Sequence, residues 1–176
     1  MVKIFKLFAY LFFFVMALIY FAPKQNLYFY AEQELQKLKV VFSKEEIVEN
    51  AFSLQLNHMK LLYDSIESAD VGSLNVELLL LYNVVSAKDI ELSSMAASFV
   101  PLRIKSVEVK YSILNPINVI FQAEGEFGEA YGKLNIVDRN VSVVLKPSLL
   151  MLNAHKGTMK ELHKNKNGEY SYDKTF

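Results

Sequence analysis

The side chains that could do chemistry near neutral pH are few in this chain. The sequence has three histidines, His58, His155 and His163, and no cysteine. Histidine titrates closest to neutrality, and cysteine would supply a thiolate nucleophile or metal ligand. His155 and His163 flank a lysine-rich segment and do not have the four-residue spacing of a helical zinc pair. We therefore expect solvated surface histidines and assign no catalytic, cofactor-binding or metal-ligating residue.

Motifs for nucleotide and hydrolytic chemistry are missing from the sequence as well. It contains no GxSxG, Walker loop or HExxH motif. Gly125, Gly128 and Gly132 cluster, but Glu126 and Glu129 between them would repel a phosphate. The glycines lie in a strand-like stretch, where they predict a bulge, a bend or a close backbone approach. We expect a protein that is not an enzyme and needs no cofactor.

The charge balance argues against a nucleic-acid partner. Lys plus Arg and Asp plus Glu are equal at 19 each, whereas nucleic-acid binders concentrate basic residues on one face. A local basic patch near the C-terminus is formed by Lys156, Lys160, Lys164 and Lys166. It is interpreted as a solvated face, with weak attraction to a membrane surface as the alternative.

An uncharged apolar run from Leu7 to Ala22 predicts a membrane anchor. The run reaches a workable span for a bilayer core when it is extended back to Ile4, with Lys6 snorkelling to the headgroups. Lys3 and Lys6 precede the run and Lys24 follows it, so the positive-inside rule places the N-terminus in the cytoplasm and exports the remainder. We expect a single-pass inner-membrane protein with a periplasmic domain.

A cleaved signal peptide is the rival interpretation of this run. Cleavage requires small residues at alternate positions before the cut. Here the run ends in Ile19, Tyr20 and Phe21, and Pro23 follows directly after Ala22. These bulky flanks favour an uncleaved anchor.

The segment after Pro23 is predicted to leave the membrane as a short helical stem. Residues Leu27 to Leu38 have a helical pattern, and Lys39 to Phe42 predict a short strand or a continuation of that helix. Ser43 and Glu46 match a capping box, which predicts a further helix of one or two turns.

From Ala51 onward the apolar residues alternate with polar ones, which predicts antiparallel strands with one face on a core. The clearest strands bring five residues to one face: Val107, Val109, Tyr111, Val119 and Phe121. Pro116 and the Asp138-Arg139-Asn140 segment mark connections between strands.

The C-terminal segment is predicted to carry short helices and one more strand. Pro147 to Asn153 has a helical pattern, and Thr158 to Glu161 matches a second capping box. Asn167-Gly168 predicts a turn before a last strand, Glu169 to Tyr172.

The predicted fold class is α+β and mainly β: a transmembrane helix, then a curved antiparallel meander with short flanking helices. The expected division is a cytoplasmic tip and anchor at 1–24, a helical stem at 25–50 and an exported β-rich domain at 51–176.

Two alternatives remain for the apolar face of the sheet. Leu78 to Tyr82 is a continuous apolar stretch, which favours a strand buried on both faces or else a docking site. A curled sheet without a second covering layer would form a groove for a lipid or for a partner's strand.

One segment resembles a known family. Phe121 to Gly128 (FQAEGEFG) is followed by Gly132 to Ile136 (GKLNI) and later by Leu145 to Ser148 (LKPS). This pattern is similar to type II secretion system protein N and AsmA-like envelope proteins. The resemblance implies an inner-membrane component with a curved periplasmic β-sheet that acts in secretion or lipid traffic.

Two functions are therefore expected for a non-catalytic anchored protein. The first is a structural or assembly component of an envelope-spanning secretion or pilus-type machine, whose partners are the bilayer and other envelope proteins. The alternative is a lipid-binding or lipid-transfer module with an apolar groove.

Overall fold

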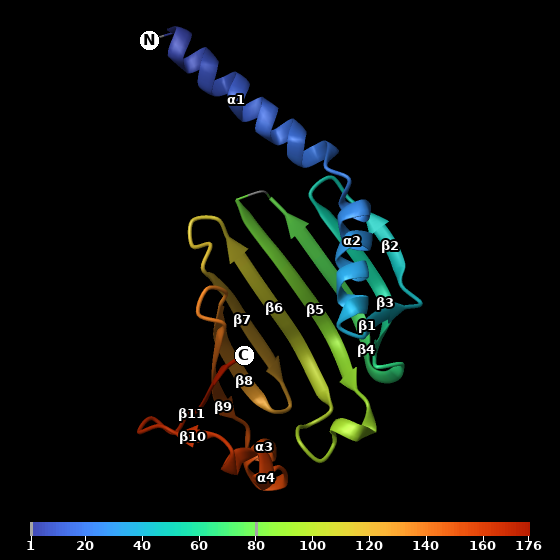
Figure 1. Ribbon diagram of the computed structural model, residues 1–176, viewed down its shortest axis with the longest axis vertical. Coiled ribbons are helices and arrows are strands. Elements are labelled where there is room, and N and C mark those ends of the chain that lie inside the picture. The colour runs from blue at the N-terminus through green and yellow to red at the C-terminus, as the bar shows by residue number, and fades with distance from the viewer. Residues whose placement is uncertain (1, 80) are drawn as a thin grey trace.

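A computed structural model describes residues 2–79 and 81–176 of the chain. It shows one long N-terminal helix, a second helix, an open antiparallel sheet of 11 strands and short helices near the C-terminus (Figure 1). The predicted fold class is confirmed.

The first helix, α1 (Val2–Phe21), is long and apolar enough to cross a membrane. It ends at Phe21, just before Pro23, and α2 (Lys24–Lys37) begins directly after the proline. Proline has no N–H to donate and its ring clashes with the preceding turn, which favours a break between the two helices at this position. The predicted helix after the anchor is confirmed, with a start at Lys24 rather than Leu27.

The prediction of a helix after Ser43 is wrong. Residues Val40–Ser43 form β1 and Glu46–Glu49 form β2. These two strands lie end to end along β3 (Ser53–Tyr63), and His58 between their pairing segments has a positive φ of 53°. Pairing with a long neighbouring strand supplies more backbone hydrogen bonds than a single capped turn. The second half of the expected stem is thus part of the sheet.

The sheet continues as a meander. It is built by β4 (Ile66–Leu78), β5 (Tyr82–Leu92), β6 (Arg103–Ser112), β7 (Asn118–Gly125), β8 (Gly128–Asn135) and β9 (Asn140–Pro147). Each pairs antiparallel with the next, and β11 (Tyr170–Thr175) and β10 (His163–Lys164) complete the order. The predicted connections at Pro116 and at residues 138–140 are confirmed, and Arg139 in the second has a φ of 49°.

Short helices follow the long strands. The 3-10 turn η1 (Ser94–Ala96) lies between β5 and β6, and α3 (Leu149–Ala154) and α4 (Lys156–Lys160) follow β9. The helix predicted from Pro147 starts later, because Pro147 is the last residue of β9. Ser148 caps α3, since its hydroxyl accepts a hydrogen bond from Met151 N at 3.1 Å. The expected helix start at Thr158 is wrong, since Thr158 lies inside α4.

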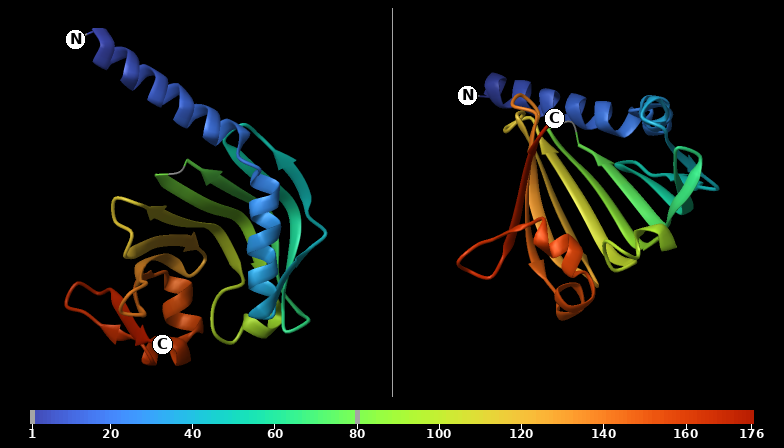
Figure 2. Two further views of the ribbon diagram at one scale, coloured as in Figure 1. Left: turned by 45° about the horizontal axis from the view of Figure 1, so that its top comes forward. Right: turned by 60° about the horizontal axis from the view of Figure 1, so that its bottom comes forward.

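The sheet is strongly curved, and the helices α2, α3 and α4 lie on its concave side (Figures 1 and 2). Under α2, a core cluster combines Tyr28 with Leu54, Leu56, Met59 and Val71. A second cluster near the C-terminus joins Leu145 with the helical residues Met151 and Met159. The core is therefore split between the two flanks of the sheet.

Candidate functional site

The three histidines do not form a site. His58 lies on β3, His163 on β10 near the opposite edge of the sheet, and His155 between α3 and α4. Within residues 2–79 and 81–176, no group of three His, Asp or Glu side chains could hold a metal ion.

The expectation of a solvated His155 is wrong, because only 8% of this residue is exposed. It closes α3 and opens α4, with His155 N donating to Met151 O and its own carbonyl accepting from Met159 N, each at 3.1 Å. These bonds hold its backbone beside the two buried methionines of the C-terminal cluster. His58 and His163 are exposed, as predicted.

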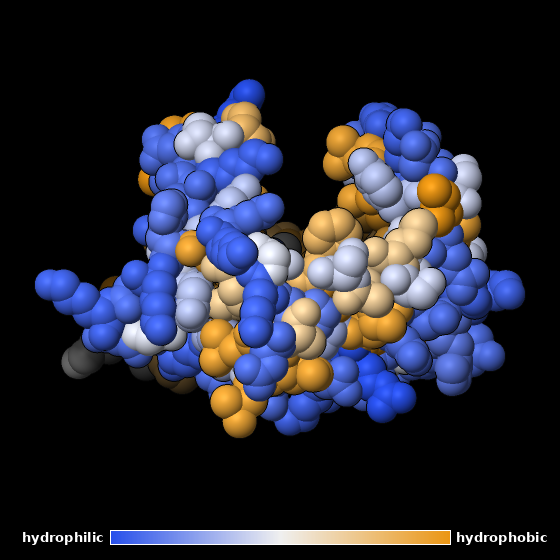
Figure 3. Space-filling model, turned by 90° about the horizontal axis from the view of Figure 1, so that it is seen from below, coloured by the Kyte–Doolittle hydropathy of each residue, from blue (hydrophilic) through white to orange (hydrophobic). Residues whose placement is uncertain are grey.

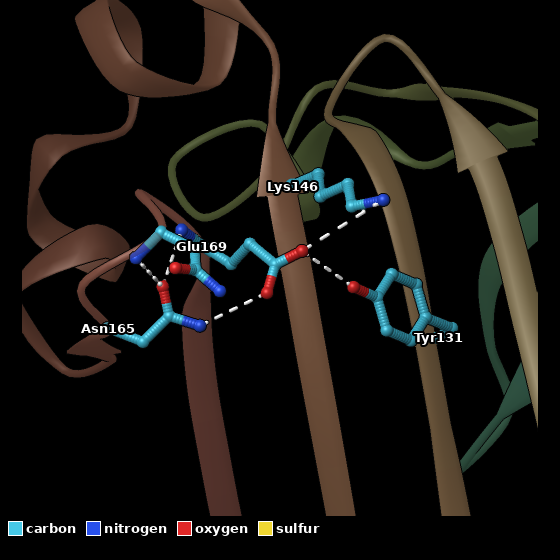
Figure 4. A network of polar contacts seen from close by, with 5 residues as sticks. Tyr131, Lys146, Asn165 and Glu169 are labelled. Carbon is cyan, nitrogen blue, oxygen red and sulfur yellow. Dashed lines mark hydrogen bonds and ion pairs between the residues drawn. The ribbon is translucent and has the colours of Figure 1, made fainter.

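A network of polar side chains connects the C-terminal hairpin, formed by β10 and β11, to β8 and β9 (Figure 4). Tyr131 donates its phenolic hydrogen to Glu169 Oε1 at 2.8 Å, and Asn165 Nδ2 donates to Glu169 Oε2 at 3.0 Å. Lys146 Nζ lies 3.9 Å from the carboxylate and 5.2 Å from the centre of the Tyr131 ring.

The pKa shifts in this network indicate a structural contact rather than a proton-transfer site. The hydrogen bond from Tyr131, followed by the one from Asn165, lowers the pKa of Glu169, and the same bond to Glu169 raises the pKa of Tyr131. Both shifts move the groups away from neutrality, opposite to the tuning that general acid–base catalysis needs.

A hollow of about 450 Å³ is lined by residues of β5 to β8 from both faces of the sheet: polar residues such as Ser86, Glu108 and Gln122 alternate with the apolar Ala87, Val107, Ala123 and Ala130. Two of its carboxylates are engaged within the chain: Gln122 Nε2 donates to Glu108 Oε1 at 2.8 Å, and Lys105 pairs with Glu124 at 2.9 Å. Among the described residues, the hollow therefore offers no set of unpaired polar groups that converge on one point.

The concave face is different, because cross-strand registers place apolar residues opposite one another across nearly the whole sheet. The first row is Leu54, Val76, Val85, Val109, Phe121, Gly132 and Val143. The second row is Leu56, Leu74, Ala87, Val107, Ala123, Ala130 and Leu145. We call this surface the trough.

The helices cover only the two sides of the trough. Leu54 and Leu56 under α2 are 1% and 0% exposed, whereas Val85 in the middle is 36% exposed. The five residues that alternation brought to one face do share it, and all are only half-buried. Seen from below, the molecule has two lobes and a notch whose floor is mostly apolar (Figure 3).

The C-terminal side of the trough deepens into an apolar pocket of about 380 Å³. Its lining includes Ile104, Phe127, Leu145, Met151 and Tyr170. Thr158 also borders the pocket, but its hydroxyl donates to Phe99 O at 2.6 Å. The volume lies within the roughly 300–1,000 Å³ typical of small-molecule sites.

Gly132, in the trough, lies too close to its neighbours to carry a side chain. A Cβ on Gly132 would lie 2.2 Å from Ser142 O and 2.6 Å from Phe121 Cζ, so the Phe121 ring lies where a side chain would stand. The predicted close backbone approach is confirmed here. Gly125 and Gly128 flank the β7–β8 turn and show the same close approach, since a Cβ would lie 2.8 Å from Arg103 O at Gly125 and 2.1 Å from Lys146 O at Gly128. Gly128 also has a φ of 112° that favours glycine.

The apolar stretch Leu78 to Tyr82 is not a strand buried on both faces. Leu78 ends β4, Tyr82 begins β5, and both Leu81 and Tyr82 are exposed; Leu80 lies outside the described residues. Because β4 and β5 pair antiparallel, the chain reverses between Leu78 and Tyr82, and this apolar stretch is a connection rather than one continuous strand.

Sequence reasoning placed Val107, Val109 and Phe121 on the face that forms the trough, but it did not find the pocket. The pocket joins β6, β8 and β9 with α3, α4 and β11, and no local pattern indicates which helices lie over which strands. Comparison of the chain with family models, with curated proteins and with solved structures returned no match.

Proposed function

We propose that the chain is a membrane-anchored, non-catalytic protein that binds the acyl chains of a membrane lipid in the trough. The observation that carries this proposal is the uncovered middle of the trough, where Val85 is 36% exposed between two well-packed flanks. An apolar strip of this kind is costly in water and marks a binding surface.

The chemistry of the trough favours an acyl chain over a polar ligand. Rows of Val, Leu, Ala and Phe offer dispersion contacts and no specific hydrogen bonds, which suits a hydrocarbon chain. The C-terminal pocket extends the same surface. A polar ligand would need convergent donors or acceptors, and the nearby Thr158 hydroxyl is already bonded within the chain.

The anchor supplies the lipid. With α1 in the inner membrane and its basic N-terminus in the cytoplasm, the sheet lies in the periplasm against the bilayer surface. The resemblance to AsmA-like and type II secretion N proteins supports the same role. An assembly role in a secretion machine is the competing function, with the trough covered by another protein.

The test uses the full chain, extracted from membranes in a gentle detergent and examined by native mass spectrometry and lipid extraction. We expect stoichiometric phospholipid on the wild-type chain and a clear loss of lipid in Val85→Asn. The matched control is Ser86→Asn, which places the same side chain on the outer face of the same strand and should retain the lipid.

Two results would overturn the proposal. One is a set of stably co-purifying membrane proteins without lipid, which would favour the assembly role. The other is equal lipid content in the Val85→Asn and Ser86→Asn variants, because lipid bound outside the trough would not distinguish the two faces.

A further inference from the structure

Four connections between strands lie at the same end of the strands, the end at which the anchor joins the domain. Strand registers pair the end of β2 with the start of β3, the end of β4 with the start of β5, the end of β6 with the start of β7, and the end of β8 with the start of β9. Figure 1 shows the β2–β3, β4–β5 and β6–β7 connections along the upper end of the sheet, toward the junction of α1 and α2, and the β8–β9 connection lower at the left. We call them, with the C-terminal Phe176, the rim.

Every one of the four connections exposes large apolar side chains. These include Phe52, Leu81, Ile113, Leu114, Ile117 and Val137. Leu114 is 88% exposed and Val137 is 72% exposed, so nothing in the described chain covers their side chains. Loops in water usually carry polar residues, and a contiguous apolar set marks a contact surface.

Hydrogen bonds between neighbouring connections hold these apolar tips together. Ile113 N donates to Leu81 O at 3.0 Å, and Ile136 N donates to Ile117 O at 2.8 Å. Phe176 N donates to Arg139 O at 3.1 Å, which adds the C-terminus to the same rim. These bonds join the β4–β5, β6–β7 and β8–β9 connections and the C-terminus into one continuous surface.

The start of α2 is fixed to this rim. Lys24 N donates to Glu49 Oε1 at the end of β2 at 3.3 Å, and Lys24 Nζ donates to Ala22 O at 3.2 Å. The Lys24 side chain is only 1% exposed. Because α1 ends three residues earlier in the chain, at Phe21, the membrane interface must lie close to the rim.

We propose that the rim is a second membrane-contacting surface, with its apolar tips inserted into the boundary between headgroups and acyl chains of the anchoring bilayer. The occupant is a lipid surface because the anchor itself brings the bilayer there. Apolar loop tips at that depth gain burial, while their backbone groups still reach water and headgroups. Membrane contact by the rim does not depend on whether the trough binds lipid.

Fluorescence can test this directly, because the wild-type chain has no tryptophan and no cysteine. We would prepare Leu114→Trp and, as the matched control, Leu149→Trp. Leu149 is 78% exposed and begins α3, at the opposite end of β9 from the rim. Both positions are exposed enough to accept an indole with the fold intact, which circular dichroism would confirm.

The full-length variants would be reconstituted into vesicles of phosphatidylethanolamine and phosphatidylglycerol with brominated acyl chains. We expect emission at position 114 to shift to the blue and to be quenched at least about twofold more than at position 149, since indoles favour the interface. Val137→Trp should behave like Leu114→Trp.

Equal lipid quenching at positions 114 and 149 would overturn the rim proposal, as would protection of position 114 from aqueous iodide without quenching by brominated lipid. Introducing Val85→Asn into the Leu114→Trp variant separates the two proposals. Loss of trough lipid with unchanged quenching at position 114 would mean that the rim contacts the membrane independently.

Discussion

Threonine substitutions of Val71 and Val85 distinguish the packed flank of the concave face from its open middle. Threonine has nearly the shape of valine and favours strands, so each change adds a hydroxyl with little change in volume or backbone preference. Val71 is 7% exposed in the cluster under α2, and Val85 is 36% exposed on the floor of the trough.

The two substitutions should lower the free energy of unfolding by different amounts. A hydroxyl at position 71 enters an apolar cluster formed with Leu54, Leu56 and Met59, and burying it without a partner costs about 1–3 kcal/mol. At position 85 the hydroxyl can reach water in the open trough, so we expect a change within about 0.5 kcal/mol. Each kcal/mol lowers Tm by roughly 2–4 °C in a chain of this size.

The measurement is urea and thermal unfolding of the full chain in detergent, followed by the near-ultraviolet circular dichroism of its tyrosines. Lipid should first be removed, because a ligand bound to the folded state adds its own stabilisation. Equal destabilisation by the two substitutions would refute the open trough, since it would mean that Val85 is covered as well as Val71.

Three further predictions concern a close contact in the trough, a helix cap and a hydrogen bond near the C-terminus. Gly132→Ala should destabilise the chain by about 1–3 kcal/mol in denaturant unfolding, because the new methyl overlaps Ser142 O and the Phe121 ring. Gly157→Ala is the control without a clash, since nothing outside its own helix and its chain neighbours lies within 4 Å of the added carbon; within α4 this change should stabilise the chain, by up to about 1 kcal/mol. Ser148→Ala should cost about 0.5–2 kcal/mol through loss of the α3 cap, whereas Ser93→Ala should be nearly silent because Ser93 makes no side-chain cap bond at η1. Because folding lowers the pKa of Glu169, its ionised carboxylate stabilises the folded chain. This stabilisation is complete at pH values above the ordinary pKa of 4.5 and is lost as the pH falls through the lower folded pKa. Carboxyl titration by NMR should therefore show a higher pKa for Glu169 in Tyr131→Phe, and an unchanged value would contradict the assigned hydrogen bond.

Local patterns in the sequence were sufficient for most of the strands. Val107, Val109 and Tyr111 alternate with polar residues, and period-two alternation follows directly from the geometry of a pleated strand. The same alternation placed these residues on one face, and the structure confirms it. The apolar run at Leu7 to Ala22 predicted a helix in the same direct way.

The failures occurred where distant partners decide the structure. Ser43 and Glu46 satisfy a capping pattern, yet the residues on both sides of Lys44 form strands because they pair with β3. The residues near Ser43 in the sequence do not indicate this pairing. His155 is buried because two short helices meet at it. Whether the apolar face is covered depends on the placement of α2, α3 and α4 over the sheet, which is tertiary information.

The length of the strands limits what the trough can do with a lipid. Strands of 8 residues, such as β7 to β9, extend about 26 Å at a rise of about 3.3 Å per residue. One leaflet of a bilayer core is about 15 Å thick, half of the roughly 30 Å core. A single acyl tail therefore fits along the strands with room to spare. A lipid held there could be lifted fully out of its leaflet, but carrying it farther from the membrane would require another acceptor within that distance.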